Sequence, residues 1–474
     1  MPNDPIASSQ QAAAFARVTA WIESYLQSPE AFRVLPVVAP GSIAAALPAA
    51  PPDDAEPLDA ILDDFERILL PGITHWNHPG FMAYFAISAS PPGVMAEMLA
   101  AALNVNAMLW KTSPAATELE QRALDWLRQM LGLGEGWFGV INDTASITTL
   151  LALAAAREAR DDLAIRTRGM AGRPDLPALR VYASAHAHSS VDKAVITLGM
   201  GQENLVHVPV DEAFRMQPGA LAAAIADDRA AGRLPIAVVA TVGTTSTGSV
   251  DPVPAIAETC RREGVWLHVD ASYAGPAAIV PECRDTLAGV DLADSLVVNP
   301  HKWLFTPVDL SAMYTKRPDV LRRAFSLVPE YLVTAEQDEV VNLMDYGVQL
   351  GRRFRALKLW MVIRAYGVSG IVEILRGHMA LAREFATWVA DEPGWMLAAP
   401  PMFSLVCFRY APEGMSDAEA DAVNQAILDR VNASGKVYLS HTKLHDRFVL
   451  RLAIGNMRTE RRHVEDAWRL LRDG

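Results

Sequence analysis

The sequence has few cysteines, fewer positive than negative charges, and no long apolar runs. Its three cysteines among 474 residues, Cys260, Cys283 and Cys407, have an odd number and a spacing that support neither a disulfide framework nor a structural zinc site. The 42 Lys and Arg residues are outnumbered by 55 Asp and Glu residues, and the net charge of -13 is the wrong sign for binding nucleic acid. We therefore expect a protein of the reducing cytoplasm with no nucleic-acid partner.

Membrane association is not expected either. No uninterrupted apolar run approaches the roughly 20 residues that a spanning helix needs, and the start, MPNDPIASSQQ, lacks the regions of a secretory signal. The hydrophobic fraction is 51%, which provides ample material for a large buried core. A chain of this length predicts a large domain with one or two smaller attachments.

Residues 1–85 carry helical patterns at 11–26 and 58–70. The stretch between them, APGSIAAALPAAPPDD at 39–54, is so rich in proline that we expect no regular element in it. Such a helical arm has little core of its own. We expect it to pack on the main body or on a second copy of the chain.

Residues 86–375 alternate helical patterns with short apolar runs, which is typical of an α/β domain with a mostly parallel sheet covered on both faces. The runs are residues 180–184, 236–241, 265–270 and 296–298. Ligands of such sheets bind beyond the carboxyl ends of the strands. Residues 376–474 predict a smaller α+β domain, with helices at 379–389 and 463–471 and strands at 403–408 and 448–454.

Polar side chains follow each predicted strand, so the fold would bring them together. They are His186, His188, Thr244, Thr245, Asp270, Asn299, His301 and Lys302. Pyridoxal phosphate requires these chemical types: an amine that bonds covalently to its aldehyde, a carboxylate that holds its ring nitrogen protonated, and a flat side chain stacked on the ring. Its phosphate needs a helix N-terminus, which Thr144 and Ser146 open in the segment INDTASITTLL.

Each residue taken alone has a simpler interpretation. Lys302 could extend its ammonium to solvent, Asp270 could cap a helix, and His188 could be a hydrogen-bonded structural histidine. Thr144 and Ser146 are good capping residues. Capping alone, however, gives no reason for Asp270 and Lys302 to end consecutive strands of one sheet.

A metal-dependent hydrolase is the alternative of another class. His186 with His188, and His268 with Asp270, are pairs two residues apart, which lie on one face of an extended chain and can bind a metal ion. The proline-rich front and the α+β tail do not provide the eight βα units of a metal-hydrolase barrel. That interpretation also leaves Lys302 without a role.

Six motifs resemble the group II pyridoxal-phosphate decarboxylases, in the aromatic-L-amino-acid decarboxylase branch. They are SPAATELE (113–120), AHSSVDKA (187–194), TVGTTSTGSVD (241–251), HVDASYAG (268–275), NPHKW (299–303) and LGRRFRALKLW (350–360). The resemblance implies a fold-type I, aspartate-aminotransferase-like architecture. It also implies a homodimer with shared active sites and an N-terminal arm that embraces the partner.

The resemblance also implies roles for individual residues. Lys302 would bond to the cofactor, Asp270 would hold the ring nitrogen, His188 would stack on the ring, and Tyr331 would protonate the substrate carbon from a loop. The other cofactor-binding residues would be Ala145, Ser146, Thr245, Ser272, Asn299 and His301, with Arg451 supporting the site from the small domain.

The substrate pocket departs from the common family pattern, because AYFAISAS replaces AYFPTxxS and places Ala86 and Ile87 where a proline and a threonine stand. Asn106 and Met108 stand where relatives usually have apolar and aromatic side chains, and Ser272 replaces a common alanine. The residues expected to contact the substrate are Tyr84, Phe85, Ile87, Met108, Trp303 and Gly351. Gly351 gives weak support for an indole substrate.

The activity expected from the resemblance is decarboxylation of an aromatic L-amino acid to the arylalkylamine and carbon dioxide. An aromatic aldehyde synthase, which couples decarboxylation to oxidative deamination, is the alternative with the same cofactor. In relatives that switch accompanies loss of the loop tyrosine or of the stacking histidine. Tyr331 and His188 are both present, so decarboxylation is the favoured activity.

Overall fold

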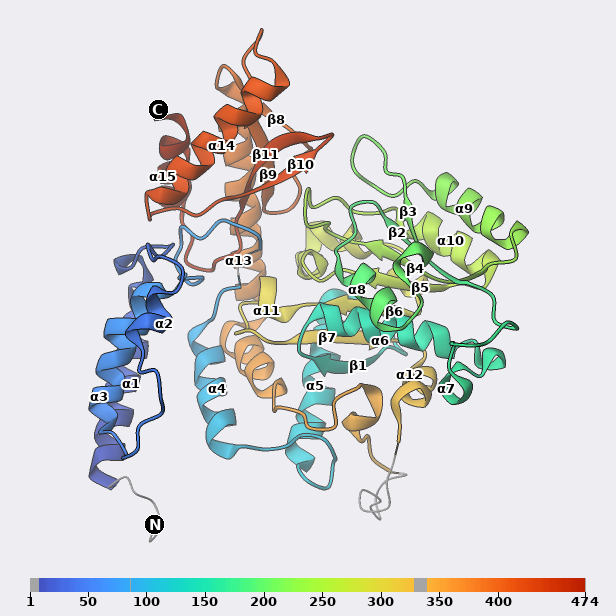
Figure 1. The fold of residues 1–474 in the computed structure, drawn as a ribbon, viewed down its shortest axis with the longest axis horizontal. Helices are drawn as coiled ribbons and strands as arrows, with labels where there is room; N and C mark the ends of the chain where they lie inside the picture. The colour runs from blue at the N-terminus through green and yellow to red at the C-terminus, as the bar shows by residue number, and fades with distance from the viewer. Residues whose placement is uncertain (1–7, 86, 328–338, 474) are drawn as a thin grey trace.

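The computed structural model describes residues 8–85, 87–327 and 339–473. Its largest layer is a seven-stranded sheet of order β1-β7-β6-β5-β4-β2-β3, in which β7 runs opposite to the other six strands (Figure 1). The prediction of a mostly parallel sheet is confirmed. The strands are β1 (Phe138–Asn142), β2 (Leu179–Ser184), β3 (Leu205–Val208), β4 (Leu234–Thr241), β5 (Trp266–Asp270), β6 (Ser295–Val298) and β7 (Ser311–Thr315).

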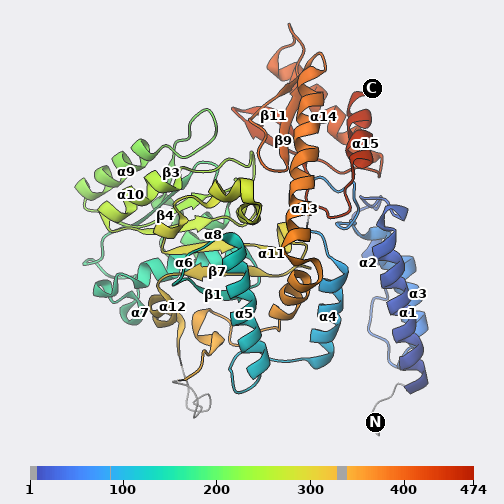
Figure 2. The same cartoon turned by 180° about the vertical axis from the view of Figure 1, so that it is seen from behind.

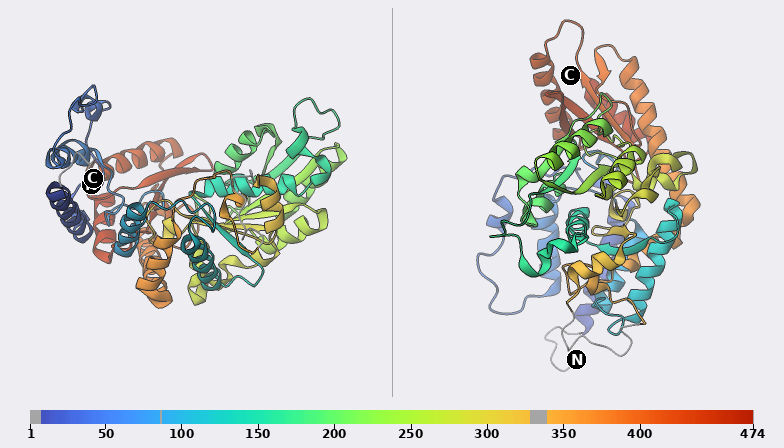
Figure 3. Two further views of the ribbon diagram at one scale, coloured as in Figure 1. Left: turned by 90° about the horizontal axis from the view of Figure 1, so that it is seen from below. Right: turned by 90° about the vertical axis from the view of Figure 1, so that its right-hand side faces the viewer.

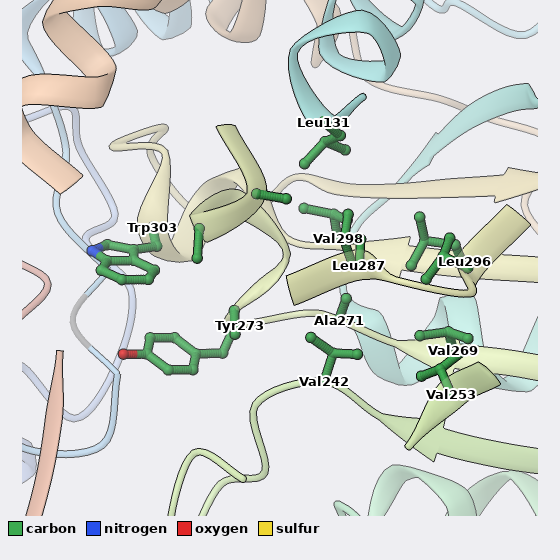
Figure 4. Close-up of a cluster of buried hydrophobic side chains, with 14 of the residues drawn as sticks. Leu131, Val242, Val253, Val269, Ala271, Tyr273, Leu287, Leu296, Val298 and Trp303 are labelled. Carbon is green, nitrogen blue, oxygen red and sulfur yellow. The ribbon is translucent and has the colours of Figure 1, made fainter. Parts of the chain in front are cut away.

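Helices cover both faces of this sheet, as the near-continuous apolar strands require. On β5, for example, Leu267 and Val269 belong to one apolar core and Trp266 to the core of the opposite face. Figure 4 shows side chains of the first core, in which Val269 of β5 lies beside Val253 and Leu131 belongs to the same cluster. The helices of the domain are α4 (Pro91–Leu103), α5 (Pro114–Leu131), α6 (Ala145–Glu158), α7 (Ile165–Arg168), α8 (Ser190–Thr197), α9 (Pro218–Ala230), α10 (Val253–Glu263), α11 (Pro300–Trp303) and α12 (Pro318–Phe325).

The smaller unit at the C-terminus is an antiparallel sheet of order β10-β11-β9-β8, covered by two helices (Figure 2). Its elements are β8 (Trp395–Leu397), β9 (Leu405–Tyr410), α14 (Asp417–Ala433), β10 (Ser440–Leu444), β11 (Arg447–Ala453) and α15 (Arg461–Arg472). The long helix α13 (Ala356–Asp391) runs from the large sheet to this unit and kinks at Gly367, whose φ of 63° favours glycine. The boundary expected at residue 375 lies inside α13, so the division at 85 and 375 stays a proposal.

The N-terminal helices α1 (Ser8–Gln27) and α3 (Leu58–Asp64) stand to the side of the body, on the far side of α4 from the large sheet (Figures 1 and 3). The expectation of no regular element in residues 39–54 was wrong, because α2 (Ser42–Ala46) forms there. The run SIAAA has no proline and good helix formers, which is enough for one turn. No helix within the described ranges has the length and the apolar character that crossing a membrane requires.

Candidate active site

A cavity of about 180 Å³ lies at the carboxyl ends of β4, β5 and β6. The fold brings to it every residue that the sequence assigned to cofactor binding. These are Ala145, Ser146, His188, Thr245, Asp270, Ser272, Asn299, His301 and Lys302. Thr144, Phe85, Thr241, Gly243 and Tyr273 complete the lining. The structure thus unites the set at one site, and the role of each member stays a proposal.

Asp270 is the last residue of β5 and lies in register between Thr241 of β4 and Val297 of β6. Its Oδ1 accepts hydrogen bonds from the backbone N–H of Ser272, at 3.0 Å, and from the Ser272 hydroxyl. Among the described residues no hydrogen bond reaches Oδ2. The carboxylate is therefore fixed through one oxygen and keeps the other for a ligand in the cavity.

Lys302 enters the cavity from α11, the short helix that follows β6, and its Nζ lies 5.7 Å from the centre of the Phe85 ring. Burial lowers the pKa of the Lys302 ammonium below its ordinary value, and the Asp270 carboxylate opposes this shift. A lowered pKa makes the neutral amine, which is the nucleophile, more accessible near neutral pH. The environment thus suits an amine that reacts with a carbonyl group.

The two histidines of the cavity use the same ring nitrogen, Nδ1, to accept a backbone hydrogen bond. Nδ1 of His188 accepts from the Ser190 backbone N–H at 3.1 Å, and Nδ1 of His301 accepts from that of Leu310 at 3.0 Å. Burial lowers the pKa of both rings, that of His301 to about 3. Both are therefore neutral near pH 7 and carry their proton on Nε2, where they act as hydrogen-bond donors.

The N-terminus of α6 supplies an anion-binding end to the cavity. Its N-cap residue, Thr144, makes no side-chain hydrogen bond to the first turn, so within the described part of the chain no capping side chain competes with a ligand for the N–H groups of that turn. These groups and the helix dipole favour a negative charge beside Ala145 and Ser146. Two other lining residues, Asn299 and Thr241, have side-chain oxygens, Oδ1 and Oγ1, that are buried without a hydrogen-bond partner among the described residues. Buried polar atoms of this kind call for a polar ligand.

Comparison with known proteins matches residues 40–411 to the pyridoxal-dependent decarboxylase conserved domain. The chain belongs to the pyridoxal-dependent decarboxylase family. It is 41% identical to tryptophan decarboxylase 2 of Oryza sativa subsp. japonica, over 96% of this chain and 93% of the relative. It is 40% identical to phenylacetaldehyde synthase of Arabidopsis thaliana, with the same coverage of the two chains. The crystal structure of Oryza sativa TDC with PLP and tryptamine superposes with a TM-score of 0.94 at 38% identity, covering 99% of this chain and 98% of the other.

The family confirms the fold-type I architecture and pyridoxal 5'-phosphate as the cofactor. The cavity fits that molecule on its own chemistry, since it joins an amine with a lowered pKa, a carboxylate with a free oxygen and a helix end suited to a phosphate. The orphan oxygens Asn299 Oδ1 and Thr241 Oγ1 add polar positions for it.

Of the six residues expected to contact the substrate, one lines the cavity and five do not. Phe85 lines the cavity, with its ring stacked on Tyr273 at a centroid distance of 3.6 Å. Trp303 is a core residue, only 1% exposed, and its indole N–H donates to His378 Nδ1 at 3.0 Å. Figure 4 shows its indole facing the Tyr273 ring, with the ring centres 5.2 Å apart. Trp303 therefore supports the cavity wall through Tyr273 and does not line the cavity.

The other four, Tyr84, Ile87, Met108 and Gly351, also lie outside the lining of this cavity. Tyr84 is 48% exposed, and its hydroxyl pairs with that of Tyr438 at 2.9 Å. Met108 packs against Leu109 and Met344, and Gly351 is exposed. Tyr331 and Ala86 lie outside the described residues.

The sequence did not identify Thr241, Gly243 and Tyr273 as members of the site. Thr241 closes β4 and could have been found, because it pairs in register with Asp270. Gly243 has a φ of 89°, and a Cβ there would lie 2.5 Å from the Cβ of Ala274, so only glycine fits. The burial of Tyr273 beneath Phe85 depends on tertiary contacts, for which the sequence carries no local signal.

The four residues of the metal-hydrolase alternative do not form a metal site. His186 is outside the cavity lining and meets Phe214 edge-on, at a centroid distance of 5.4 Å. His268 is fully buried, with Nδ1 paired to Ser295 Oγ at 2.9 Å. Within the described ranges, no group of three or more His, Cys, Asp or Glu side chains is arranged to hold a metal ion. The chain's membership of the pyridoxal-dependent decarboxylase family rules out the metal-dependent hydrolase.

Proposed function

We propose that this enzyme decarboxylates an aromatic L-amino acid to the arylalkylamine and carbon dioxide. The observation that carries the proposal is the single cavity in which Lys302, Asp270 and the N-terminus of α6 meet. The bound cofactor supplies an electron-withdrawing ring that takes up the electrons left at the substrate's α-carbon when carbon dioxide departs. The rest of the catalysis is the work of the chain's own side chains.

In this proposal each group acts on a different part of the cofactor. Lys302 would hold the cofactor's aldehyde through its amine. Asp270 would hold the protonated ring nitrogen, and His188 would stack on the ring. Ala145, Ser146, Asn299 and His301 would hold the phosphate, with Thr245 beside the ring.

The surroundings of the reacting carboxylate are proposed to be apolar. Phe85, stacked on Tyr273, forms the aromatic wall of the cavity. The nearby cation Arg451 is already engaged, since its N–H groups donate to the carbonyl oxygens of Thr245 and Ser246 and to Ser440 Oγ. A strong ion pair would stabilise the substrate carboxylate more in the ground state than in the transition state, in which its charge is being lost. Without such an ion pair, decarboxylation is faster.

The proton that replaces the carboxylate is assigned to Tyr331, assisted by His188. The hydrogen bond from Ser190 N–H to Nδ1 leaves the His188 proton on Nε2, which is the nitrogen available to the cavity. Proton transfer by a positioned side chain contributes about 10²- to 10⁴-fold to a reaction.

A homodimer with shared active sites is part of the proposal, with α4 in the interface. Four apolar side chains of this helix, Met95, Met98, Leu99 and Leu103, are exposed and spaced so that they form one stripe. The opposite side of α4 packs on α13. A second copy would cover the stripe, and it would also bring the exposed Tyr84 and Gly351 near an active site, where they could contact the substrate.

The cytoplasm is the proposed location, in keeping with a chain whose three cysteines, Cys260, Cys283 and Cys407, are all unpaired.

The deciding experiment is a substrate panel scored by product. The purified protein loaded with pyridoxal phosphate is given tryptophan, 5-hydroxytryptophan, tyrosine, dihydroxyphenylalanine, phenylalanine and, as a non-benzenoid control, histidine. We expect amine and carbon dioxide in equal amounts from at least one benzenoid or indole substrate, with a kcat/KM well above that for histidine. Activity on none of the aromatic substrates would contradict the proposal.

The aldehyde synthase remains the second candidate, because one relative at 40% identity is a phenylacetaldehyde synthase. It would be recognised in the same experiment by aldehyde, ammonia and hydrogen peroxide in place of amine, with oxygen consumed.

A further inference from the structure

Ser272 holds Asp270 through two hydrogen bonds to one oxygen. Its backbone N–H donates to Asp270 Oδ1 at 3.0 Å, and its hydroxyl donates to the same atom. Both residues are 6% exposed, and both line the cavity. The backbone bond belongs to a local turn that any residue at position 272 could form, whereas the hydroxyl bond depends on serine.

No other side chain donates to this carboxylate within the described ranges. Thr241 is its cross-strand neighbour, yet Thr241 Oγ1 has no hydrogen-bond partner there. His268 lies two residues before Asp270 on the same face of β5, and its Nδ1 is paired with Ser295 Oγ. Burial lowers the pKa of His268 to about 4, so that ring is neutral near pH 7. Among the residues that the structure describes, the Ser272 hydroxyl is therefore the one side-chain donor that fixes Asp270.

We propose that Ser272 is a positioning residue that directs Asp270 Oδ2 at the cofactor's ring nitrogen and keeps the proton on that nitrogen. Two donors on Oδ1 hold the carboxylate in one orientation, and within the described ranges Oδ2 has no hydrogen-bond partner. Hydrogen bonds to a carboxylate stabilise its charged form. In a pair that shares one proton, stabilising the carboxylate shifts the proton toward the ring nitrogen. The proposal depends on the assignment of Asp270 made above.

The test compares Ser272→Ala with wild type in three measurements. The ring nitrogen of ¹⁵N-labelled pyridoxal phosphate bound to the variant is expected to shift toward the neutral-pyridine value in the NMR spectrum. The apoprotein is expected to bind the cofactor about three- to tenfold more weakly, the order of one lost hydrogen bond to a charged group. The kcat is expected to fall about tenfold while KM stays within about twofold, because the lost interaction acts on the cofactor and not on the substrate.

Thr117→Val is the matched control, because it removes another buried hydroxyl, one outside the cavity lining. Thr117 is a fully buried residue of α5, and its hydroxyl has no hydrogen-bond partner in the part of the chain that the structure describes. We expect the NMR shift, the cofactor Kd and the kcat of this variant to match wild type. If Ser272→Ala does not fold, Ser272→Cys is used instead, because cysteine keeps a side chain of similar size with a weak donor. Its NMR shift, cofactor Kd and kcat are expected to change in the same direction as those predicted for Ser272→Ala, but by less.

Asp270→Asn separates failure of this inference from failure of the proposed function. If Asp270→Asn changes the ¹⁵N shift and the kcat strongly, while the Ser272 variants leave the ¹⁵N shift and the cofactor Kd within error of wild type, the positioning role is wrong and the assignment of Asp270 stands. If Asp270→Asn changes neither quantity, the assignment of Asp270 fails and this inference fails with it.

Discussion

The guanidinium of Arg451 donates to the carbonyl oxygen of Thr245 at 2.6 Å and so joins the small domain to the wall of the cavity. The same side chain donates to the Ser246 carbonyl oxygen at 3.0 Å and to Ser440 Oγ at 2.8 Å. Arg451 is buried, and among the described residues no carboxylate pairs with it. Burying a cation without a counter-ion costs free energy. We therefore infer that Arg451 is retained because its hydrogen bonds hold the backbone of Thr245 and Ser246 in place.

Replacing Arg451 by Met is expected to weaken both stability and cofactor binding. The change leaves three acceptors without their donor, which destabilises the fold by roughly 1–3 kcal/mol. It also frees the loop that carries Thr245, so the Kd for pyridoxal phosphate should rise several-fold. Denaturant unfolding of the apoprotein and cofactor titration measure the two effects.

Arg451→Lys is the informative control for that change. A lysine keeps the charge, but its ammonium cannot serve the same acceptors in the planar geometry of a guanidinium. We expect the free energy of unfolding and the cofactor Kd of Arg451→Lys to lie between those of wild type and those of Arg451→Met. Unchanged cofactor affinity in both variants would show that the hydrogen bonds of Arg451 do not hold the loop that carries Thr245 in its binding position.

Lys302→Ala should abolish the covalent attachment of the cofactor while leaving the fold intact. Lys302 is the amine of the cavity and makes no side-chain hydrogen bond to any described residue, so its removal takes away chemistry and little packing. We expect loss of the visible absorbance of the bound cofactor and a fall in turnover of at least about 10³-fold, as for other nucleophile deletions. Absorbance spectra of the dialysed protein and turnover with the best aromatic substrate provide the measurements.

Lys443→Ala is the matched control, since Lys443 is an exposed lysine of β10, far along the chain from the cavity. It should retain both the absorbance and the turnover. A Lys302→Ala protein that keeps the wild-type spectrum would rule out Lys302 as the attachment site.

If the exposed apolar stripe on α4 forms the proposed dimer interface, charged side chains introduced into the stripe should separate the two copies. The double substitution Leu99→Asp and Leu103→Asp places two carboxylates where an apolar interface is proposed, and desolvating them is costly. We expect a monomer by light scattering and a loss of activity, since the substrate contacts proposed for Tyr84 and Gly351 need the second copy. Leu292→Asp is the control, because Leu292 is 61% exposed, the same as Leu103, on a different part of the surface. An active monomer would contradict the shared site.

The sequence predicted the cavity well because its residues follow strands that are buried on both faces. The position of Asp270 and Lys302 at one sheet edge follows from the parallel order of β5 and β6, which apolar runs and connections indicate. β1 and β7 were not predicted, because FGVIN and SAMYT mix small and polar residues in short runs without a clear period.

The side-chain directions beyond the strand ends could not be predicted in the same way. Trp303 ends α11, a helix of four residues, and only the packing of Tyr273 and His378 decides that its indole points into the core. The boundary expected at residue 375 falls inside α13, whose buried apolar side chains belong to the core of the large sheet up to Met379 and to the core of the smaller unit from Ala382 on. Tertiary contacts, which local periodicity does not encode, settle both features.

Tyr331→Phe tests which of two products the enzyme makes. Removing the phenol is expected to leave carbon dioxide release within about threefold of wild type but to divert product from amine to aldehyde, because the α-carbon loses its proton donor and becomes open to oxygen. The aldehyde route balances as amino acid, oxygen and water giving aldehyde, carbon dioxide, ammonia and hydrogen peroxide. Chromatography of amine and aldehyde, with an oxygen electrode, gives the partition directly. Tyr410→Phe in β9 is the control and should leave the products unchanged. An unaltered amine yield in Tyr331→Phe would show that Tyr331 is not the proton donor.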